Sequence, residues 1–163
     1  AARVPQDFGV YWLDGNEIRP FKQAEPKVVT DKSRSVLKIL APVPVVSGKA
    51  TVELDGERSA NVVNTATPEF YFRLAVLERF GIVKLTTKKG ARVVEKWTIA
   101  PITGEITQEQ QRVEILRREV EEGIYKIWPK EPLPRGEYAV VEYTEGQRNT
   151  QVWDFSCQPT SKP

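Results

Sequence analysis

The sequence predicts an all-β fold, an antiparallel β-sandwich of immunoglobulin-like or related type, and three observations support this prediction. Short blocks rich in Val, Ile, Tyr, Phe and Trp alternate apolar with polar residues, as half-buried strands do. Gly, Pro, Asp and Asn residues separate these blocks and favour turns. The blocks also follow one another too closely for the helical crossovers of βαβ units. The sequence also allows one short helix within this β-sandwich.

The first elements are expected to form a hairpin. Residues 8–13 and 17–21 are extended runs on either side of Asp14-Gly15-Asn16, and Gly15 tolerates the positive φ that a tight turn requires. Residues 35–40 alternate cleanly and lead to a segment with two prolines, which favours an edge strand or an extended connector. Two further short strands are expected at residues 49–54 and 60–63.

A second hairpin with long arms is expected at residues 82–99. Residues 82–87 and 92–99 flank Lys88-Lys89-Gly90, and its lysines favour an exposed turn. The remaining strands are expected at residues 124–128, 136–144 and 151–155.

Two segments leave helix and strand open. Residues 67–80 begin with Thr67-Pro68, a helix-start signal, but their dense aromatic residues alternate and favour a strand. Residues 107–122 begin with a capping-box pattern at Thr107 and end at Gly123, yet Val113 alternates with charged neighbours. We expect a strand in residues 67–80 and leave residues 107–122 undecided.

A turn before a late strand has a recognisable pattern. Within the sequence Leu133-Pro134-Arg135-Gly136-Glu137-Tyr138, Pro134 and Gly136 shape the turn. Tyr138 is placed to bury its ring while its hydroxyl bonds back to the backbone of the turn. This tyrosine corner occurs in many immunoglobulin-like and transthyretin-like sandwiches, and it predicts architecture rather than activity.

Several of these motifs together resemble a family of uncharacterised exported bacterial proteins, including acidobacterial ones. The motifs are, in chain order, Phe8-Gly9-Val10-Tyr11, the run Pro68-Glu69-Phe70-Tyr71-Phe72-Arg73-Leu74, Lys88-Lys89-Gly90, Gly123-Ile124-Tyr125 and the turn before Tyr138. The likeness spans about residues 8–155 and implies export, a β fold and strands in both open segments. It supplies no functional residues.

Length and composition favour one domain outside the cytoplasm. The 163 residues fit a single β-sandwich domain at 1–157, with residues 1–7 as an extended arm and residues 158–163 as a polar tail. Ala1 and Ala2 are the small residues that signal cleavage leaves behind, so we expect a secreted, periplasmic or cell-surface protein. No run is long enough to be a transmembrane segment. The chain has no Met or His and many charged residues, which also predicts thermostability.

Composition excludes much active-site chemistry. With no His and one Cys, the chain lacks imidazole bases, His metal ligands, thiolate clusters and an intrachain disulfide. Cys157 is expected to pack as a small apolar residue. No phosphate-binding Gly-rich loop occurs, and a net charge of +2 disfavours nucleic acid as a partner. We therefore predict no catalytic, cofactor-binding or metal-binding residues, and no enzyme.

The aromatic residues are the remaining candidates for a binding site. Neighbouring positions such as Tyr11 and Trp12 must point to opposite faces of a strand, so some of these rings are expected at the surface. The candidate binding aromatics are Tyr11, Trp12, Trp97, Trp128 and Trp153.

The leading functional hypothesis is a non-enzymatic structural or interaction module. Its partner would be another protein or a second copy of itself, in a homo-oligomer or a surface filament built by strand addition from residues 1–7. The alternative is a carbohydrate- or peptide-binding module with a glycan as the possible ligand of the exposed aromatics.

Overall fold

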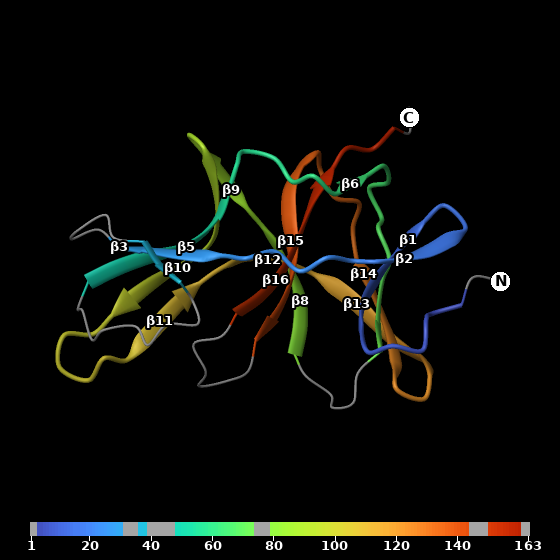
Figure 1. Cartoon of the computed structure of the whole chain (residues 1–163), viewed down its shortest axis with the longest axis horizontal. Helices are drawn as coiled ribbons and strands as arrows, with labels where there is room; N and C mark the ends of the chain where they lie inside the picture. The colour runs from blue at the N-terminus through green and yellow to red at the C-terminus, as the bar shows by residue number, and fades with distance from the viewer. Residues whose placement is uncertain (1–2, 31–35, 39–47, 74–78, 144–149, 161–163) are drawn as a thin grey trace.

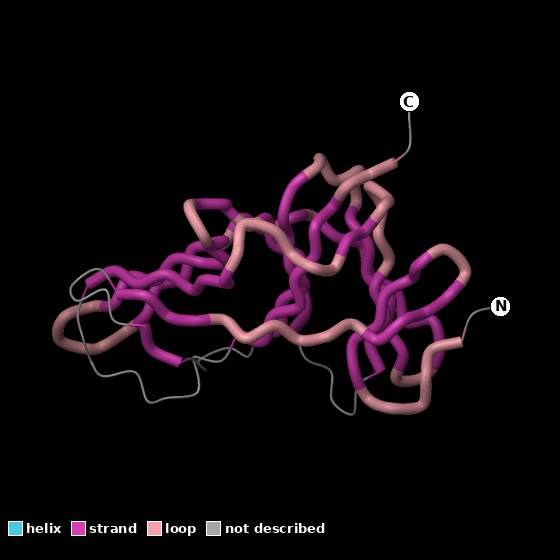
Figure 2. The backbone as a smooth tube through the Cα atoms, turned by 45° about the horizontal axis from the view of Figure 1, so that its top comes forward, coloured by secondary structure: helices cyan, strands magenta, loops and turns pink. Residues whose placement is uncertain are grey.

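The computed structural model of the 163-residue chain describes residues 3–30, 36–38, 48–73, 79–143 and 150–160. In this part of the chain sixteen strands form three sheets, and no helix occurs. The sheets lie side by side along the long axis of the molecule (Figure 1), and loops and turns join the strands (Figure 2). The predicted all-β class with mainly antiparallel pairing is confirmed.

Sheet A lies at the side of the molecule where the chain starts, on the right in Figure 1. Its order is β13-β14-β7-β1-β2, with antiparallel neighbours throughout. The strands are β1 (Gly9–Asp14), β2 (Glu17–Pro20), β7 (Phe70–Arg73), β13 (Ile115–Glu121) and β14 (Ile124–Pro129). Strands β1 and β2 are the predicted first hairpin, and Gly15 in its turn has a φ of 62°.

Sheet B lies in the middle, and its order is β12-β8-β15-β16-β6. The strands are β6 (Val62–Val63), β8 (Arg79–Lys84), β12 (Gln111–Val113), β15 (Gly136–Tyr143) and β16 (Thr150–Cys157). Strands β6 and β16 are parallel, whereas the other pairs of this sheet are antiparallel.

Sheet C lies at the other side, with the order β11-β10-β5-β3-β4 and with β9 also paired to β10. The strands are β3 (Lys27–Thr30), β4 (Val36–Lys38), β5 (Gly48–Asp55), β9 (Thr86–Lys88), β10 (Ala91–Ile99) and β11 (Ile106–Glu109). Strand β4 confirms the expected edge position at this part of the chain, while the two prolines after it lie outside the described residues.

Two hydrophobic cores lie between the three sheets. Core AB includes Phe70 and Phe72 from sheet A and Tyr138 and Val140 from sheet B. Core BC, by contrast, is built from sheets B and C, with residues such as Trp97 on the sheet C side. The alternate residues Ala139 and Val141 of β15 enter core BC. Sheet B is therefore buried on both faces, because successive side chains of a strand point in opposite directions.

The structure decides both segments that the sequence left open. Strands β7 and β8 occupy the described parts of residues 67–80, and β11, β12 and β13 occupy residues 106–121. The helical alternatives are wrong at these positions. Strands β11, β12 and β13 are edge strands of sheets C, B and A, in that order. Residues 106–121 therefore pair with all three sheets in succession.

The second predicted hairpin needs a correction. Only β9 pairs with β10 across the turn at Gly90, and β8 belongs to sheet B instead. The chain changes sheets at Leu85, whose amide donates to the Glu137 carbonyl at 2.9 Å and whose side chain is buried in core BC. Burial of Leu85 between the two sheets therefore divides the expected long arm.

Candidate functional site

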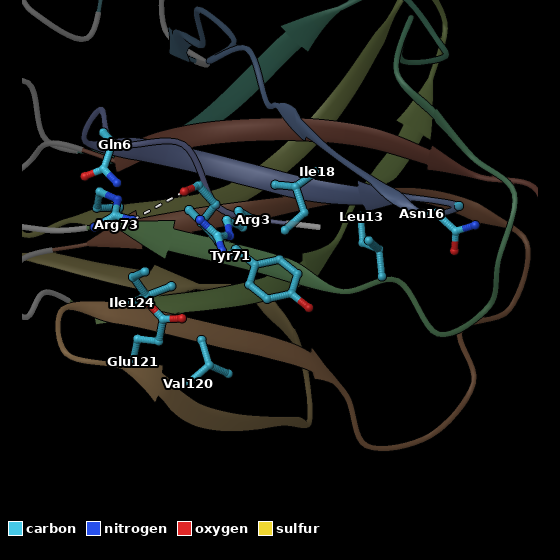
Figure 3. Close-up of a pocket in the computed structure, with 12 residues that line it drawn as sticks. Arg3, Gln6, Leu13, Asn16, Ile18, Tyr71, Arg73, Val120, Glu121 and Ile124 are labelled. Atoms are coloured by element: carbon cyan, nitrogen blue, oxygen red, sulfur yellow. Dashed lines mark hydrogen bonds between the residues drawn. The ribbon is translucent and has the colours of Figure 1, made fainter. Parts of the chain in front are cut away.

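A groove of about 1130 Å³ lies on the outer face of sheet A, the face opposite core AB. We call it the arm groove, because residues 3–7 form part of its wall. Figure 3 shows Tyr71 of β7 at its centre and Arg73 at one end beside Gln6, with Leu13 and Ile18 on the β1–β2 side and Ile124 on the β14 side. Apolar side chains and hydrogen-bond donors thus share one concave surface.

Strand alternation explains why these side chains face the groove. In β7, Phe70 and Phe72 are buried in core AB, so Tyr71 and Arg73 point to the outer face. The neighbouring strands follow the same register, since Tyr11 pairs with Tyr71 and Ile124 pairs with Arg73. The outer face of sheet A is therefore partly apolar rather than uniformly charged.

Residues 3–7, the arm, cross this face in contact with Arg73 and Tyr11. The Arg73 guanidinium donates from Nε to the Pro5 carbonyl at 2.6 Å and from Nη2 to the Val4 carbonyl at 3.3 Å. The Tyr11 hydroxyl donates to the Asp7 carbonyl at 2.7 Å. Side-chain donors thus hold the arm by three backbone carbonyls.

Charges near the groove act on its two tyrosines. Burial raises the pKa of Tyr71, and Glu69 adds to the rise while Lys126 opposes it. Lys126 forms an ion pair with Glu69 at 2.6 Å beside this ring. Burial also raises the pKa of Tyr11, with Asp7 adding to it. Both hydroxyls therefore stay protonated at neutral pH and act as hydrogen-bond donors.

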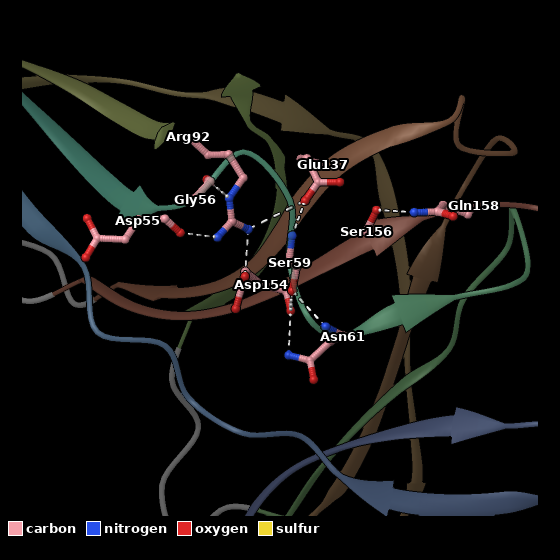
Figure 4. Close-up of polar contacts among 9 residues, drawn as sticks. All are labelled: Asp55, Gly56, Ser59, Asn61, Arg92, Glu137, Asp154, Ser156 and Gln158. Carbon is pink, nitrogen blue, oxygen red and sulfur yellow. Dashed lines mark hydrogen bonds and ion pairs between the residues drawn. The ribbon is translucent and has the colours of Figure 1, made fainter. Parts of the chain in front are cut away.

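A second polar site lies between sheets B and C, where Arg92 of β10 is buried against two carboxylates. Its Nη1 atom lies 2.6 Å from Asp154 Oδ2 and 3.6 Å from Glu137 Oε1. The other donors of Arg92 bind backbone carbonyls, Nε to Gly56 at 2.9 Å and Nη2 to Asp55 at 3.0 Å (Figure 4). One guanidinium therefore joins both sheets and the end of β5.

The loop after β5 is fastened to the same cluster. The Ser59 amide donates to Glu137 Oε1 at 2.6 Å, and the Ser59 hydroxyl donates to the Asp154 carbonyl at 3.2 Å. Asn61 Nδ2 donates to the same carbonyl at 3.0 Å. These contacts hold the loop against β15 and β16, and one of them, from the Ser59 amide, gives the buried Glu137 carboxylate part of the hydrogen bonding that burial requires.

A third buried carboxylate, that of Glu95, lies where β10 departs from regular pairing. The register of β10 with β5 shifts between Val93 and Glu95. The Glu95 carboxylate accepts a hydrogen bond from Trp97 Nε1 at 2.8 Å and another from Gln110 Nε2. Glu95 thus fixes the Trp97 ring inside core BC, which makes this cluster a packing feature.

The five candidate aromatics do not form one surface. Tyr11, Trp97 and Trp153 are buried, and Trp12 packs partly buried against core AB. Tyr11 and Trp128 both face the outer side of sheet A, and only Trp128 is partly exposed there, with Lys126 Nζ 4.9 Å from its ring centroid. Tyr11 is 5% exposed, and its hydroxyl bonds to the Asp7 carbonyl.

The turn around Tyr138 agrees with the sequence prediction. The Tyr138 hydroxyl donates to the Pro134 carbonyl at 2.8 Å, which is the expected tyrosine corner. A Cβ at Gly136 would lie 3.7 Å from Tyr138 Cε2, an ordinary van der Waals contact, so the ring packs over this residue without requiring glycine there. A second corner, which we did not predict, joins Tyr11 to Asp7, again across four residues and with a glycine two residues before the tyrosine.

No comparable sequence pattern marks the two arginines, Arg73 and Arg92. Arg73 reaches the arm over 68 residues of sequence, and Arg92 reaches Asp154 over 62. Neither distance corresponds to a local motif. For Arg73, the one indication in the sequence is that it directly follows the aromatic run Phe70-Tyr71-Phe72, which places a charged side chain at the end of a largely buried strand.

Comparisons of the chain with family models, with curated proteins and with solved structures find no match. The resemblance to exported bacterial proteins therefore stays an expectation. Among the described residues, no group of three or more His, Cys, Asp or Glu side chains is arranged to hold a metal ion. In the same part of the chain no helix is long and apolar enough to cross a membrane.

Proposed function

We propose that the protein is a non-enzymatic interaction module that assembles with copies of itself, and that the arm of one copy occupies the arm groove of another. The observation that supports this most directly is the way in which the arm is held. Arg73 and Tyr11 bind it through the carbonyls of Val4, Pro5 and Asp7. Contacts to carbonyls depend little on which side chains the bound segment carries.

The arm is also weakly integrated into its own fold. Among the described residues, residues 3–7 belong to no strand and make no backbone-to-backbone hydrogen bond. The Tyr11 contact is worth roughly 1 kcal/mol after competition with water, and each of the two contacts from the charged Arg73 about 1.5–3 kcal/mol. An arm held by side-chain contacts alone is suited to exchange, because an identical arm from a second copy would restore every contact that is lost.

The size and lining of the groove suit an extended polypeptide. Its volume of about 1130 Å³ remains open with the arm in place, at the upper end of typical ligand sites. Ile18, Leu13 and Val120 offer apolar contacts, while Arg73 and Tyr71 offer hydrogen bonds. A carbohydrate ligand is less well supported, because only one of the five candidate aromatics, Trp128, is partly exposed on this side.

Two finer expectations belong to the same proposal. The immunoglobulin-like sandwich is supported by the tyrosine corner at Tyr138, although a third sheet and a second core add to that pattern. The extracytoplasmic location is supported by the resemblance alone and stays a prediction.

The test is the molar mass in solution, measured by size-exclusion chromatography with light scattering over a concentration series. We expect the full chain to exceed the monomer mass at high concentration. A chain without residues 1–6, which keeps the Asp7 carbonyl for Tyr11, should remain monomeric. The substitution Arg73→Ala should act in the same direction, whereas Arg118→Ala, at an exposed position of β13, should behave like the unchanged chain.

Two outcomes would contradict the proposal. A full chain that is monomeric at every concentration, like its two variants, would remove the self-assembly. An oligomer that persists without residues 1–6 would show that a different surface joins the copies.

A further inference from the structure

The buried cluster around Arg92 contains more negative than positive charge. Arg92 is one cation beside two carboxylates, those of Asp154 and Glu137, and all three residues are less than 10% exposed. Arg92 makes hydrogen bonds to Asp154 and to two carbonyls, but its Nη1 atom lies 3.6 Å from Glu137, beyond hydrogen-bond distance. Glu137 is thus the less compensated of the two acids.

One carboxylate oxygen of Glu137 is also unpartnered. Oε1 accepts the Ser59 amide, whereas Oε2 has no hydrogen-bond partner among the described residues. Figure 4 shows the second oxygen pointing away from Arg92, toward the side where Ser156 and Gln158 lie. This oxygen is not one of the fully buried polar atoms without a partner, so it is accessible from the side of a neighbouring pocket that Glu137 lines, where a cationic group of a ligand can pair with it.

This oxygen belongs to a residue that lines a separate pocket, which we call the Glu137 pocket. Its volume is about 340 Å³, near the lower end of small-molecule sites. Ser156 forms part of the wall, with its hydroxyl accepting a hydrogen bond from Gln158 Nε2 at 3.1 Å. Buried polar groups and exposed charged groups therefore surround one small space.

The charged residues that line the Glu137 pocket indicate which class of ligand it can bind. Arg58 and Arg135 are exposed at the pocket, and Glu57 is the second acid of the lining. Two guanidinium groups against two carboxylates give no net charge, which disfavours both a bare cation and a bare anion. A ligand with a cationic and an anionic group a few ångströms apart satisfies Glu137 and an arginine together.

We propose that the Glu137 pocket binds a small zwitterion of the α-amino acid class. Its ammonium group binds Glu137 Oε2, and its carboxylate binds the guanidinium of Arg58 or Arg135. This site is independent of the arm groove, which lies on the outer face of sheet A.

Titration of the ¹⁵N-labelled full chain with L-alanine at pH 7, followed by amide chemical shifts, tests the proposal. We expect saturable shifts at Ser59, Glu137 and Ser156. Methylammonium and acetate, each carrying one of the two charges, should bind at least about tenfold more weakly, because each loses one charge-assisted hydrogen-bond pair.

Variants identify the groups that bind. Glu137→Gln keeps an acceptor for the Ser59 amide but removes the charge, and should weaken L-alanine binding at least about tenfold. The double substitution Arg58→Ala and Arg135→Ala should do the same, and both positions are exposed, so this variant decides the question if Glu137→Gln does not fold. Arg118→Ala is the matched control and should bind as the unchanged chain does.

Three results would overturn the proposal. The first is an absence of saturable shifts with L-alanine, which would make the pocket a hydrated gap beside a structural cluster. The second is binding of methylammonium as tight as that of L-alanine. The third is unchanged binding in the double arginine variant.

Discussion

Replacing Arg92 by methionine is expected to destabilise the protein more than any change to a surface ion pair. The substitution keeps a long side chain but removes the guanidinium, so Asp154 and Glu137 remain as two buried acids without a cation. The carbonyls of Asp55 and Gly56 also lose their donors. Removing one partner of a buried ion pair costs about 3–5 kcal/mol, and we expect a loss of about 4 kcal/mol for Arg92→Met.

Such a loss is a large part of the roughly 5–15 kcal/mol that stabilises a typical domain. The assay is urea unfolding at pH 7, with the free energy of unfolding obtained by linear extrapolation. Arg19→Met is the control, because Arg19 pairs with Asp14 at the surface and such pairs contribute less than about 1 kcal/mol. Adding Asp154→Asn and Glu137→Gln to Arg92→Met should recover much of the loss by removing the unpaired charges.

The reasoning would be refuted if Arg92→Met lay within about 1 kcal/mol of the unchanged chain. It would also be refuted if the triple variant were no more stable than the single one. In the first case the cluster would be hydrated rather than buried, and in the second the destabilisation would come from packing rather than from charge.

Three further outcomes follow from the buried hydroxyl and thiol groups. Tyr11→Phe should lower the free energy of unfolding by about 1 kcal/mol in the same urea assay, because the Asp7 carbonyl loses its donor. The Cys157 thiol is fully buried and burial raises its pKa, so a disulfide reagent should react with it far more slowly in the native chain than in urea. Burial also raises the pKa of Tyr11, Tyr71 and Tyr138, so the unfolded chain releases protons that the native state keeps. These groups should therefore leave the free energy of unfolding unchanged near neutral pH and lower it as the pH rises from about 9 toward 11. Urea unfolding at several pH values in this range measures the change. A free energy of unfolding that does not vary with pH in this range would contradict the prediction.

Local signals account for the parts of the fold that the sequence could predict. The turn at Gly15 depends on one residue that accepts a positive φ, and the corner at Tyr138 joins residues four positions apart. Alternation likewise predicted the strand β7, where aromatic residues point into core AB at every second position. Each of these features depends on residues that are close in the sequence.

Irregular pairing in β10 explains why the sequence does not predict the buried position of Arg92. Strict alternation places Arg92 and Trp97 on opposite faces, because an odd number of positions separates them. Both are buried, because the register of β10 shifts between Val93 and Glu95. A bulge of this kind leaves little trace in the composition of a strand, so the buried ion cluster around Arg92 could not be predicted.

Long-range contacts explain why the arm groove was missed. The sequence predicted residues 1–7 as an extended arm, but it did not indicate which surface of the chain this arm contacts. Arg73 provides that surface by binding the carbonyls of Val4 and Pro5, and the Tyr11 hydroxyl binds that of Asp7. All three contacts are made to backbone carbonyls, so no pattern of side chains in the arm predicts them.

The double burial of sheet B implies that the two cores unfold together. Tyr138 and Val140 belong to core AB, whereas Ala139 and Val141, on the same strand, belong to core BC. Loss of either core would expose one face of sheet B to water and so weaken the packing of the other. We therefore expect one transition in ¹⁹F spectra of the 5-fluorotryptophan-labelled chain during urea unfolding, with Trp153 in core AB and Trp97 in core BC changing at the same midpoint. Two separate midpoints, assigned with Trp97→Phe and Trp153→Phe, would show that sheet B retains its structure when one core is lost, and that each core is stable by itself.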